Sequence, residues 1–151
     1  MTARKLHSNF EKASESPGFL LWQGTNLWQR KQQAALKEFN LTHVQFVLLA
    51  GLAWLSGEDE NITQIALSRF TGTDRMMTSQ VVRTLIKKGL LTRSRHPTDT
   101  RAYILKVTDA GLELVNRAII SVESTDKNFF SVLGREDISN LVRMLSLLSS
   151  Q

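Results

Sequence analysis

Residues 74–107 limit the possible folds of this chain more than any other stretch. Thr78, Val81, Val82 and Leu85 stand at the spacing that places side chains on one face of a helix. Two lysines and a glycine follow, which is typical of a helix end, because cations favour the negative pole of the helix dipole and glycine suits the turn beyond it. The segment therefore begins with a predicted amphipathic helix that has one buried stripe.

The sequence pattern changes directly after this helix. Leu91–Arg93 and Ala102–Val107 are rich in aliphatic, β-branched and aromatic residues and predict two strands. Between them, Ser94–Arg101 is polar and contains a proline, as expected of a hairpin tip. A helix followed at once by a basic β-hairpin is the outline of a winged helix.

Positive charge is concentrated in the same part of the chain. From Arg69 to Lys106 there are nine basic and two acidic residues, whereas the rest of the chain has ten basic and twelve acidic ones. The net charge of +5 is therefore local, and a local basic surface indicates phosphate binding. The alternative is an ordinary solvated face, but the charge coincides with the helix-and-hairpin pattern.

The predicted helix carries polar, basic or flexible residues on the face opposite its apolar stripe. These are Met76, Ser79, Gln80, Arg83 and Lys87. A short helix is predicted over residues 63–70, and the turn between the two helices contains Gly72, as a tight helix-turn-helix corner requires.

In these features the chain resembles the MarR (multiple-antibiotic-resistance regulator) type of winged helix-turn-helix protein. The resemblance rests on Ile62–Leu67, on Lys88–Leu91, on Asp99-x-Arg101 and on Leu105–Gly111. It spans nearly the whole chain. It implies a mainly α fold with a small β-hairpin wing, whose N- and C-terminal helices form a dimer interface. It also implies a homodimeric transcription regulator that binds double-stranded DNA at a pseudo-palindromic operator.

The resemblance also implies roles for individual side chains. Ser79, Gln80 and Arg83 are expected to contact bases or phosphates in the major groove, although the family often has a basic residue in place of Gln80, and glutamine suits adenine. Arg101 is expected in the minor groove with Asp99 orienting it. Residues at the start of the predicted recognition helix and basic residues of the wing are also expected to contact DNA. The expected DNA contacts are Thr73, Arg75, Met76, Ser79, Gln80, Arg83, Lys87, Arg95, Asp99, Arg101 and Lys106.

Two alternatives to this interpretation stay open. Asp99 and Arg101 could form an exposed ion pair that contributes little to stability. The winged fold could also serve as a protein-interaction module without DNA, because fold does not fix function. Strong salt dependence of duplex binding distinguishes the two functions.

The flanking segments predict helices with more apolar surface than a small winged domain can cover. We expect one domain over residues 1–151, with a loose arm at 1–15 and the winged helix-turn-helix at 41–108. Helices at 17–39 and 109–150 are expected to form the dimerisation part. Tryptophans 22, 28 and 54 lie on helices that the family fold brings together. The alternatives for Trp22, Trp28 and Trp54 are core packing in the dimer or the wall of a pocket for a small aromatic effector.

Other kinds of chemistry are not expected. The chain has no cysteine, which excludes disulfides, thiolate zinc sites and thiol-based sensing, and its three histidines are far apart, so no metal or cofactor is expected. His96 is interpreted as a phosphate neighbour or as plain wing surface. Phosphate-loop and nucleophile motifs are missing, which argues against an enzyme. Neither a membrane span nor a signal peptide is evident, so a cytoplasmic protein is expected.

Overall fold

The computed structural model describes residues 6–151 and shows a mainly helical chain with one antiparallel hairpin, as the sequence predicts. Three short 3₁₀ turns join the main elements, at Ala13–Glu15, Lys37–Phe39 and Phe130–Val132. The main elements are α1 (Pro17–Leu36), α2 (His43–Leu55), α3 (Gln64–Thr71), α4 (Arg75–Lys87), β1 (Leu91–Arg95), β2 (Tyr103–Val107), α5 (Asp109–Phe129) and α6 (Arg135–Ser149). The predicted loose arm contains the first of the 3₁₀ turns, and its residues 1–5 lie outside the described part.

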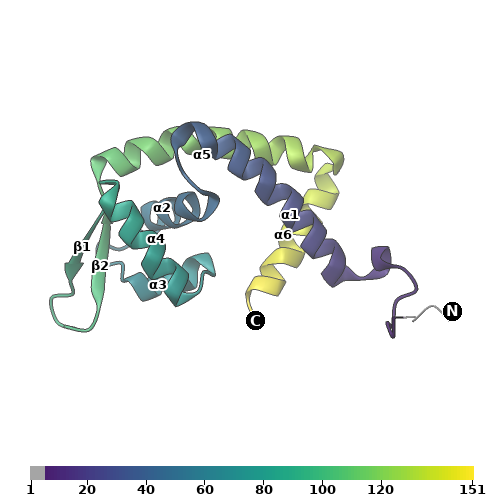
Figure 1. Ribbon diagram of the computed structural model, residues 1–151, viewed down its shortest axis with the longest axis horizontal. Helices are drawn as coiled ribbons and strands as arrows, with labels where there is room; N and C mark the ends of the chain where they lie inside the picture. Colours follow the sequence, from purple (N-terminus) through teal and green to yellow (C-terminus); the bar gives the residue numbers. More distant parts are fainter. Residues whose placement is uncertain (1–5) are drawn as a thin grey trace.

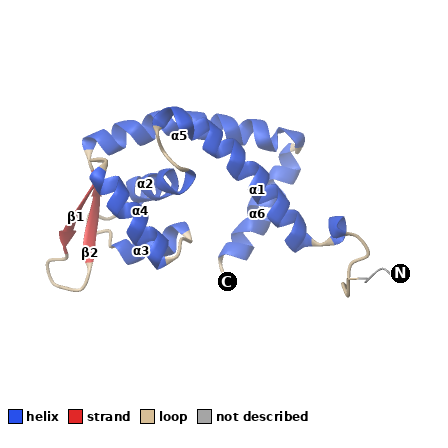
Figure 2. Cartoon of the chain, viewed as in Figure 1, coloured by secondary structure: helices blue, strands red, loops and turns tan. Residues whose placement is uncertain are grey.

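Helix α5 runs along the top of the molecule in Figure 1, and two groups of elements lie below it. The hairpin, α2, α3 and α4 lie under one end of α5, whereas α1 and α6 lie toward its other end. Both strands belong to the first group (Figure 2). The predicted recognition elements and the terminal helices thus lie at opposite ends of α5.

The helix starts follow from capping side chains in the sequence. Ser16 accepts a hydrogen bond from the backbone N–H of Phe19, and proline follows it at the first position of α1. Thr42 and Gln45 form the predicted capping box of α2. Helix α1 was expected to reach about Phe39, but its α-helical part ends three residues earlier, in a 3₁₀ turn that closes at the left-handed residue Asn40.

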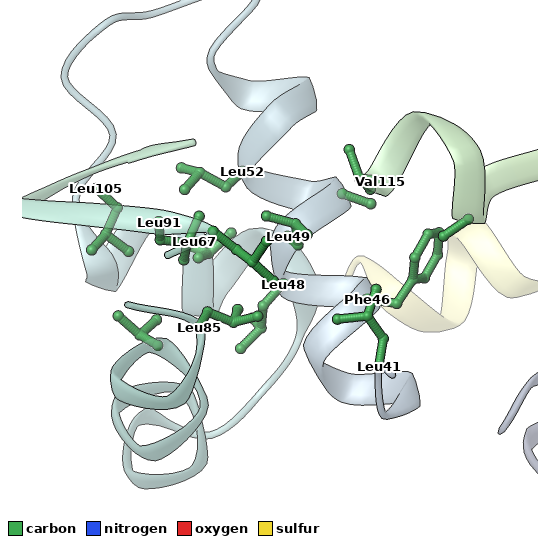
Figure 3. Packing of buried hydrophobic residues seen from close by; sticks show 14 of the residues in the cluster. Leu41, Phe46, Leu48, Leu49, Leu52, Leu67, Leu85, Leu91, Leu105 and Val115 are labelled. Atoms are coloured by element: carbon green, nitrogen blue, oxygen red, sulfur yellow. The ribbon is translucent and has the colours of Figure 1, made fainter. Parts of the chain in front are cut away.

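The core lies around α2, which is apolar on nearly all sides as predicted (Figure 3). Leucines from α2 pack against leucines from α3, α4 and both strands, and Val115 of α5 closes the cluster. The fully buried leucines at its centre are Leu36, Leu48, Leu49, Leu52, Leu67 and Leu85. This packing fixes α4 and the hairpin relative to each other.

The hairpin is better anchored than the sequence indicates, and its strands have other bounds than expected. Strand β2 begins at Tyr103, one residue after the expected start at Ala102. Strand β1 continues two residues beyond the expected end at Arg93, because Ser94 and Arg95 pair with residues of β2. The connection between α2 and α3 also joins the hairpin. The backbone N–H of Leu105 donates to the carbonyl of Ile62, and Thr63 forms an isolated bridge with β2. The wing is therefore held on both sides.

Candidate nucleic-acid interface

Helix α4 presents its predicted polar face to solvent. Thr78, Val82 and Leu85 are fully buried on the inner face. On the outer face Met76 is 74% exposed, and Gln80, Arg83 and Lys87 are exposed as well. Asp74 caps the helix by accepting hydrogen bonds from two backbone N–H groups of the first turn, at 2.9 and 3.0 Å.

The turn before α4 is closed by hydrogen bonds of Thr73 and Thr78. Thr78 donates its hydroxyl proton to the carbonyl of Asp74 at 2.7 Å, so the 2.7 Å contact between Thr73 and Thr78 uses the proton of Thr73. Thr71 donates its hydroxyl proton to the carbonyl of Leu67 at 2.8 Å and lies 2.9 Å from the Thr73 hydroxyl. The Thr73 backbone N–H donates to the carbonyl of Ser68. Thr73 therefore positions the helix start, and its expected contact with DNA stays a prediction.

Two basic side chains at this surface are tied back to the protein. Arg83 donates from Nε to the carbonyl of Ser79 at 3.3 Å, which holds its guanidinium over the exposed helix face. Lys88 donates to the carbonyl of Asn40 and to the amide oxygen of Gln45, so it links the end of α4 to the start of α2. Of the two adjacent lysines, Lys87 is the one that extends from the surface.

Asp99 organises the tip of the wing through its backbone neighbours. The imidazole Nδ1 of His96 accepts hydrogen bonds from the backbone N–H groups of Thr98 and Asp99, at 3.3 and 3.2 Å. The Asp99 carboxylate in turn accepts from the backbone N–H of Arg101 at 3.0 Å. Asp99 therefore fixes the backbone from which the Arg101 side chain extends, rather than holding the guanidinium itself. His96 forms part of this turn.

The two faces of the hairpin separate the predicted phosphate contacts. Arg95 pairs with Tyr103, and side chains two positions apart share a face, so Arg93 and Arg95 lie together with Tyr103. Lys106 pairs with Thr92 and lies on the other face, where it lines a hollow with the end of α2. Arg95 and Lys106, which were both expected to contact DNA, therefore lie on opposite faces of the hairpin, because their register positions differ by an odd number.

Arg93 joins this surface although it was missing from the expected contacts. Its guanidinium carbon lies 4.5 Å from the ring centre of Tyr103. Such a cation–π contact holds the side chain on the hairpin face that also carries Arg95. Because residues two positions apart in a strand lie on the same face, the expected contact Arg95 could have identified Arg93 in the sequence.

A second hollow lies at the junction between the winged part and the terminal helices. This junction cavity measures about 390 Å³ and is lined by residues of α1, α2, α3 and α5. Trp28 and Trp54 both line it, whereas Trp22 is 68% exposed and borders a different hollow on α1. The structure thus brings together two of the three tryptophans expected to share a pocket.

One wall of the junction cavity contains a polar cluster that the sequence analysis missed. Asp126 accepts two hydrogen bonds at Oδ1, each 2.7 Å long, from the indole N–H of Trp28 and the amide of Gln32. His43 is buried and meets Trp28 edge to face at 4.9 Å. These side chains come from three helices, α1, α2 and α5. In the sequence, the features that could have indicated the cluster were a histidine and a glutamine within otherwise apolar stretches.

Burial lowers the pKa of His43 below its ordinary value of 6.5, although the nearby Asp126 carboxylate acts in the opposite direction. Because the folded pKa lies below the unfolded one, the unfolded chain binds more protons as the pH falls through 6.5. We expect the free energy of unfolding to decrease between pH 7.5 and pH 5.5. In His43→Gln this decrease should be smaller. Urea unfolding followed by tryptophan fluorescence measures both, and equal pH slopes in the two proteins would contradict the prediction.

Within residues 6–151, no group of His, Asp and Glu side chains is placed to hold a metal ion. No helix in the same range is long and apolar enough to cross a membrane.

Comparison with known proteins identifies the family. The model of the MarR family matches residues 41–103. The HTH-type transcriptional regulator YdcH of Bacillus subtilis (strain 168) is 46% identical over 141 residues, which cover 92% of this chain and 96% of that protein. The chain belongs to the MarR family. It is a DNA-binding transcription regulator and not an enzyme, as the sequence indicated.

Solved structures of other proteins have the same fold. BpsR from Bordetella bronchiseptica superposes with a TM-score of 0.85 at 23% identity, and the match covers 95% of this chain and 99% of that one. A mutant of MarR from E. coli, complexed with operator DNA, gives a TM-score of 0.78 at 20% identity, covering 87% of this chain and 91% of that one. These similarities support the winged-helix assignment of the hairpin and of α4.

Proposed function

We propose that this MarR-family regulator binds a pseudo-palindromic operator as a homodimer and that a small aromatic ligand in the junction cavity controls the binding. The observation that carries the DNA part is the common exposure of the α4 outer face and the basic hairpin. Both belong to the one segment that holds the excess positive charge.

The proposed DNA surface combines groove reading with phosphate contacts. In it, Ser79, Gln80 and Arg83 face the major groove, where every base pair presents a distinct pattern of donors and acceptors. Arg101 enters the minor groove from the wing tip. Further candidates around them are Arg75, Met76, Lys87, Arg93 and Arg95, with Asp99 as a positioning residue. The complex of E. coli MarR with operator DNA, which has this fold, supports the arrangement.

A second copy of the chain is the proposed partner of the terminal helices. Helix α6 has no buried residue, and its apolar side chains are exposed along the whole helix. Leu141 and Leu145 form a groove of about 370 Å³ with Leu20, Leu21 and the aromatic residues at the end of α5. Removal of this surface from water by a copy of the same helices stabilises a dimer and places two recognition helices on one duplex.

The junction cavity is the proposed ligand site, because it contacts both the terminal helices and the helix-turn-helix. Thr71 lines the cavity, and its hydroxyl lies 2.9 Å from the hydroxyl of Thr73, which donates to Thr78 of α4. A ligand that displaces Thr71 therefore acts on the start of the recognition helix. In BpsR of Bordetella bronchiseptica, 6-hydroxynicotinic acid regulates DNA binding, which supports small-molecule control in a protein of this fold.

Substitutions in the wing test the DNA part of the proposal. We expect Arg101→Ala to weaken binding to the cognate duplex by roughly 1–3 kcal/mol and to reduce the salt slope by about one, because a cation in the groove is lost. Asp99→Ala should also weaken binding, because the backbone of Arg101 loses its restraint. Fluorescence anisotropy across a salt series, with a duplex from the DNA flanking the gene, measures both.

The Asp99 variant separates two opposed effects. Loss of a negative charge near DNA by itself strengthens binding, whereas loss of the 3.0 Å hydrogen bond to the Arg101 backbone weakens it. Lys106→Ala, on the other face of the hairpin, is the control and should change affinity less than Arg101→Ala. Tighter binding by Asp99→Ala or unchanged binding by Arg101→Ala removes the wing from the contact surface. Duplex binding that is insensitive to salt would favour a protein-interaction module instead.

A further inference from the structure

We propose that the junction cavity selects a ligand that combines an aromatic ring with a positive charge, such as an aryl-alkyl ammonium ion, over aromatic carboxylates. This inference rests on the proposed ligand control and specifies the chemistry of that same site.

The charged groups in the cavity wall are both acidic. They are Glu123 and Asp126, one turn apart on α5. Neither lysine nor arginine is among the described residues that line the cavity. His43 supplies no compensating charge at neutral pH, because burial lowers the pKa of its imidazole. A ligand carboxylate in this cavity therefore meets two like charges and no cationic partner, whereas an ammonium group meets two opposite charges.

The rest of the wall suits the same kind of ligand. Trp28, Phe46, Trp54 and Phe70 line the cavity from α1, α2 and α3. Aromatic faces attract cations through the ring quadrupole and also pack against an aryl ring, so one wall serves both parts of the ligand.

The polar cluster behind the wall offers acceptors rather than donors. Both hydrogen bonds to Asp126 reach Oδ1, which fixes the carboxylate and leaves Oδ2 able to accept from a ligand. Gln32 uses its amide nitrogen on this carboxylate and on the carbonyl of Val122. Its Oε1 atom is buried without a hydrogen-bond partner in the described part of the chain. Gln32 does not line the cavity, so the carboxylate of Asp126 is the acceptor in this cluster that a ligand can complement by donating a hydrogen bond.

Three probes that share a phenyl ring and a two-carbon spacer test the charge preference. They are 2-phenylethylammonium, 2-phenylethanol and 3-phenylpropionate, each titrated into the protein at pH 7.5 by calorimetry. We expect the cation to bind about 10-fold more tightly than the alcohol, with the carboxylate weakest. The net charge of +5 attracts the carboxylate to the protein as a whole, so a cation preference has to come from the cavity.

Variants on α5 connect this preference to the cavity. Glu123→Gln and Asp126→Asn should each lower the affinity for the ammonium probe by about 3- to 10-fold and leave that for the alcohol unchanged, because only the charge is removed. Glu113→Gln, the same substitution on the same helix but outside the cavity lining, is the matched control and should change neither.

The inference is overturned if the carboxylate binds as tightly as the cation, if the three probes bind equally, or if none binds. An equal loss of ammonium affinity in Glu113→Gln also overturns it. Anisotropy on the gene-flanking duplex, measured without any probe, reports separately on the proposed function. Lack of DNA binding together with an intact cation preference would contradict that function and leave the cavity chemistry in place.

Discussion

Replacing Val142 and Leu148 by aspartate should convert the protein into a monomer at micromolar concentration. Both side chains flank the apolar stripe of α6 and are 60% and 55% exposed in the single chain, so their loss removes little packing within one protomer. In a dimer built on α6, each aspartate buries a charge without a partner, at a cost of several kcal/mol. We expect operator affinity to fall by at least about 100-fold, because two linked half-site contacts become independent.

Sedimentation analysis and operator anisotropy of the same preparations check this result. Ser139→Asp with Ser146→Asp places the same charge on the polar face of α6, seven residues apart, and should leave the dimer intact. Circular dichroism should show that both variants keep their helices. A double variant at Val142 and Leu148 that sediments as a dimer, or a parent protein that sediments as a compact monomer, would contradict the proposed interface.

Gly111→Ala should be the most destabilising single substitution among the glycines. A Cβ at this position would overlap the carbonyl oxygen of Leu90 and lie 3.0 Å from a methyl group of Val107. The same carbonyl accepts the backbone N–H of Thr108, and the Thr108 hydroxyl binds the carbonyl of Gly89, so the start of α5 has no room to shift. We expect a loss of about 3 kcal/mol or more, the upper range for overpacking.

Urea unfolding at one fixed protein concentration measures this effect, since association changes the apparent stability of a dimer. Gly18→Ala is the control, because the nearest atom to its added Cβ is 4.0 Å away, and it should change stability by at most about 0.5 kcal/mol. Similar stabilities for Gly111→Ala and Gly18→Ala would show that α5 can move away from Leu90.

The helices, the hairpin and the basic segment could be predicted from local patterns in the sequence. The caps Ser16 and Thr42 and the glycine at position 72 act through contacts within about one helical turn, and the stripe from Thr78 to Leu85 repeats within about two turns. All the residues that make up such a pattern lie close together in the sequence, so the pattern can be recognised without knowledge of the fold. Such patterns were sufficient to predict the helix-turn-helix, the hairpin and the basic segment.

Which candidate side chains act together depends on contacts between elements that are distant in the sequence. Strand register places Lys106 on the face opposite Arg95, and Thr73 donates both its protons to groups inside the protein. Asp126 reaches Trp28 across 98 positions of the sequence, whereas Trp22, six residues before Trp28, points elsewhere. These arrangements depend on how α1, α2 and α5 pack, and helix packing joins residues whose separation in the sequence carries no periodic signal.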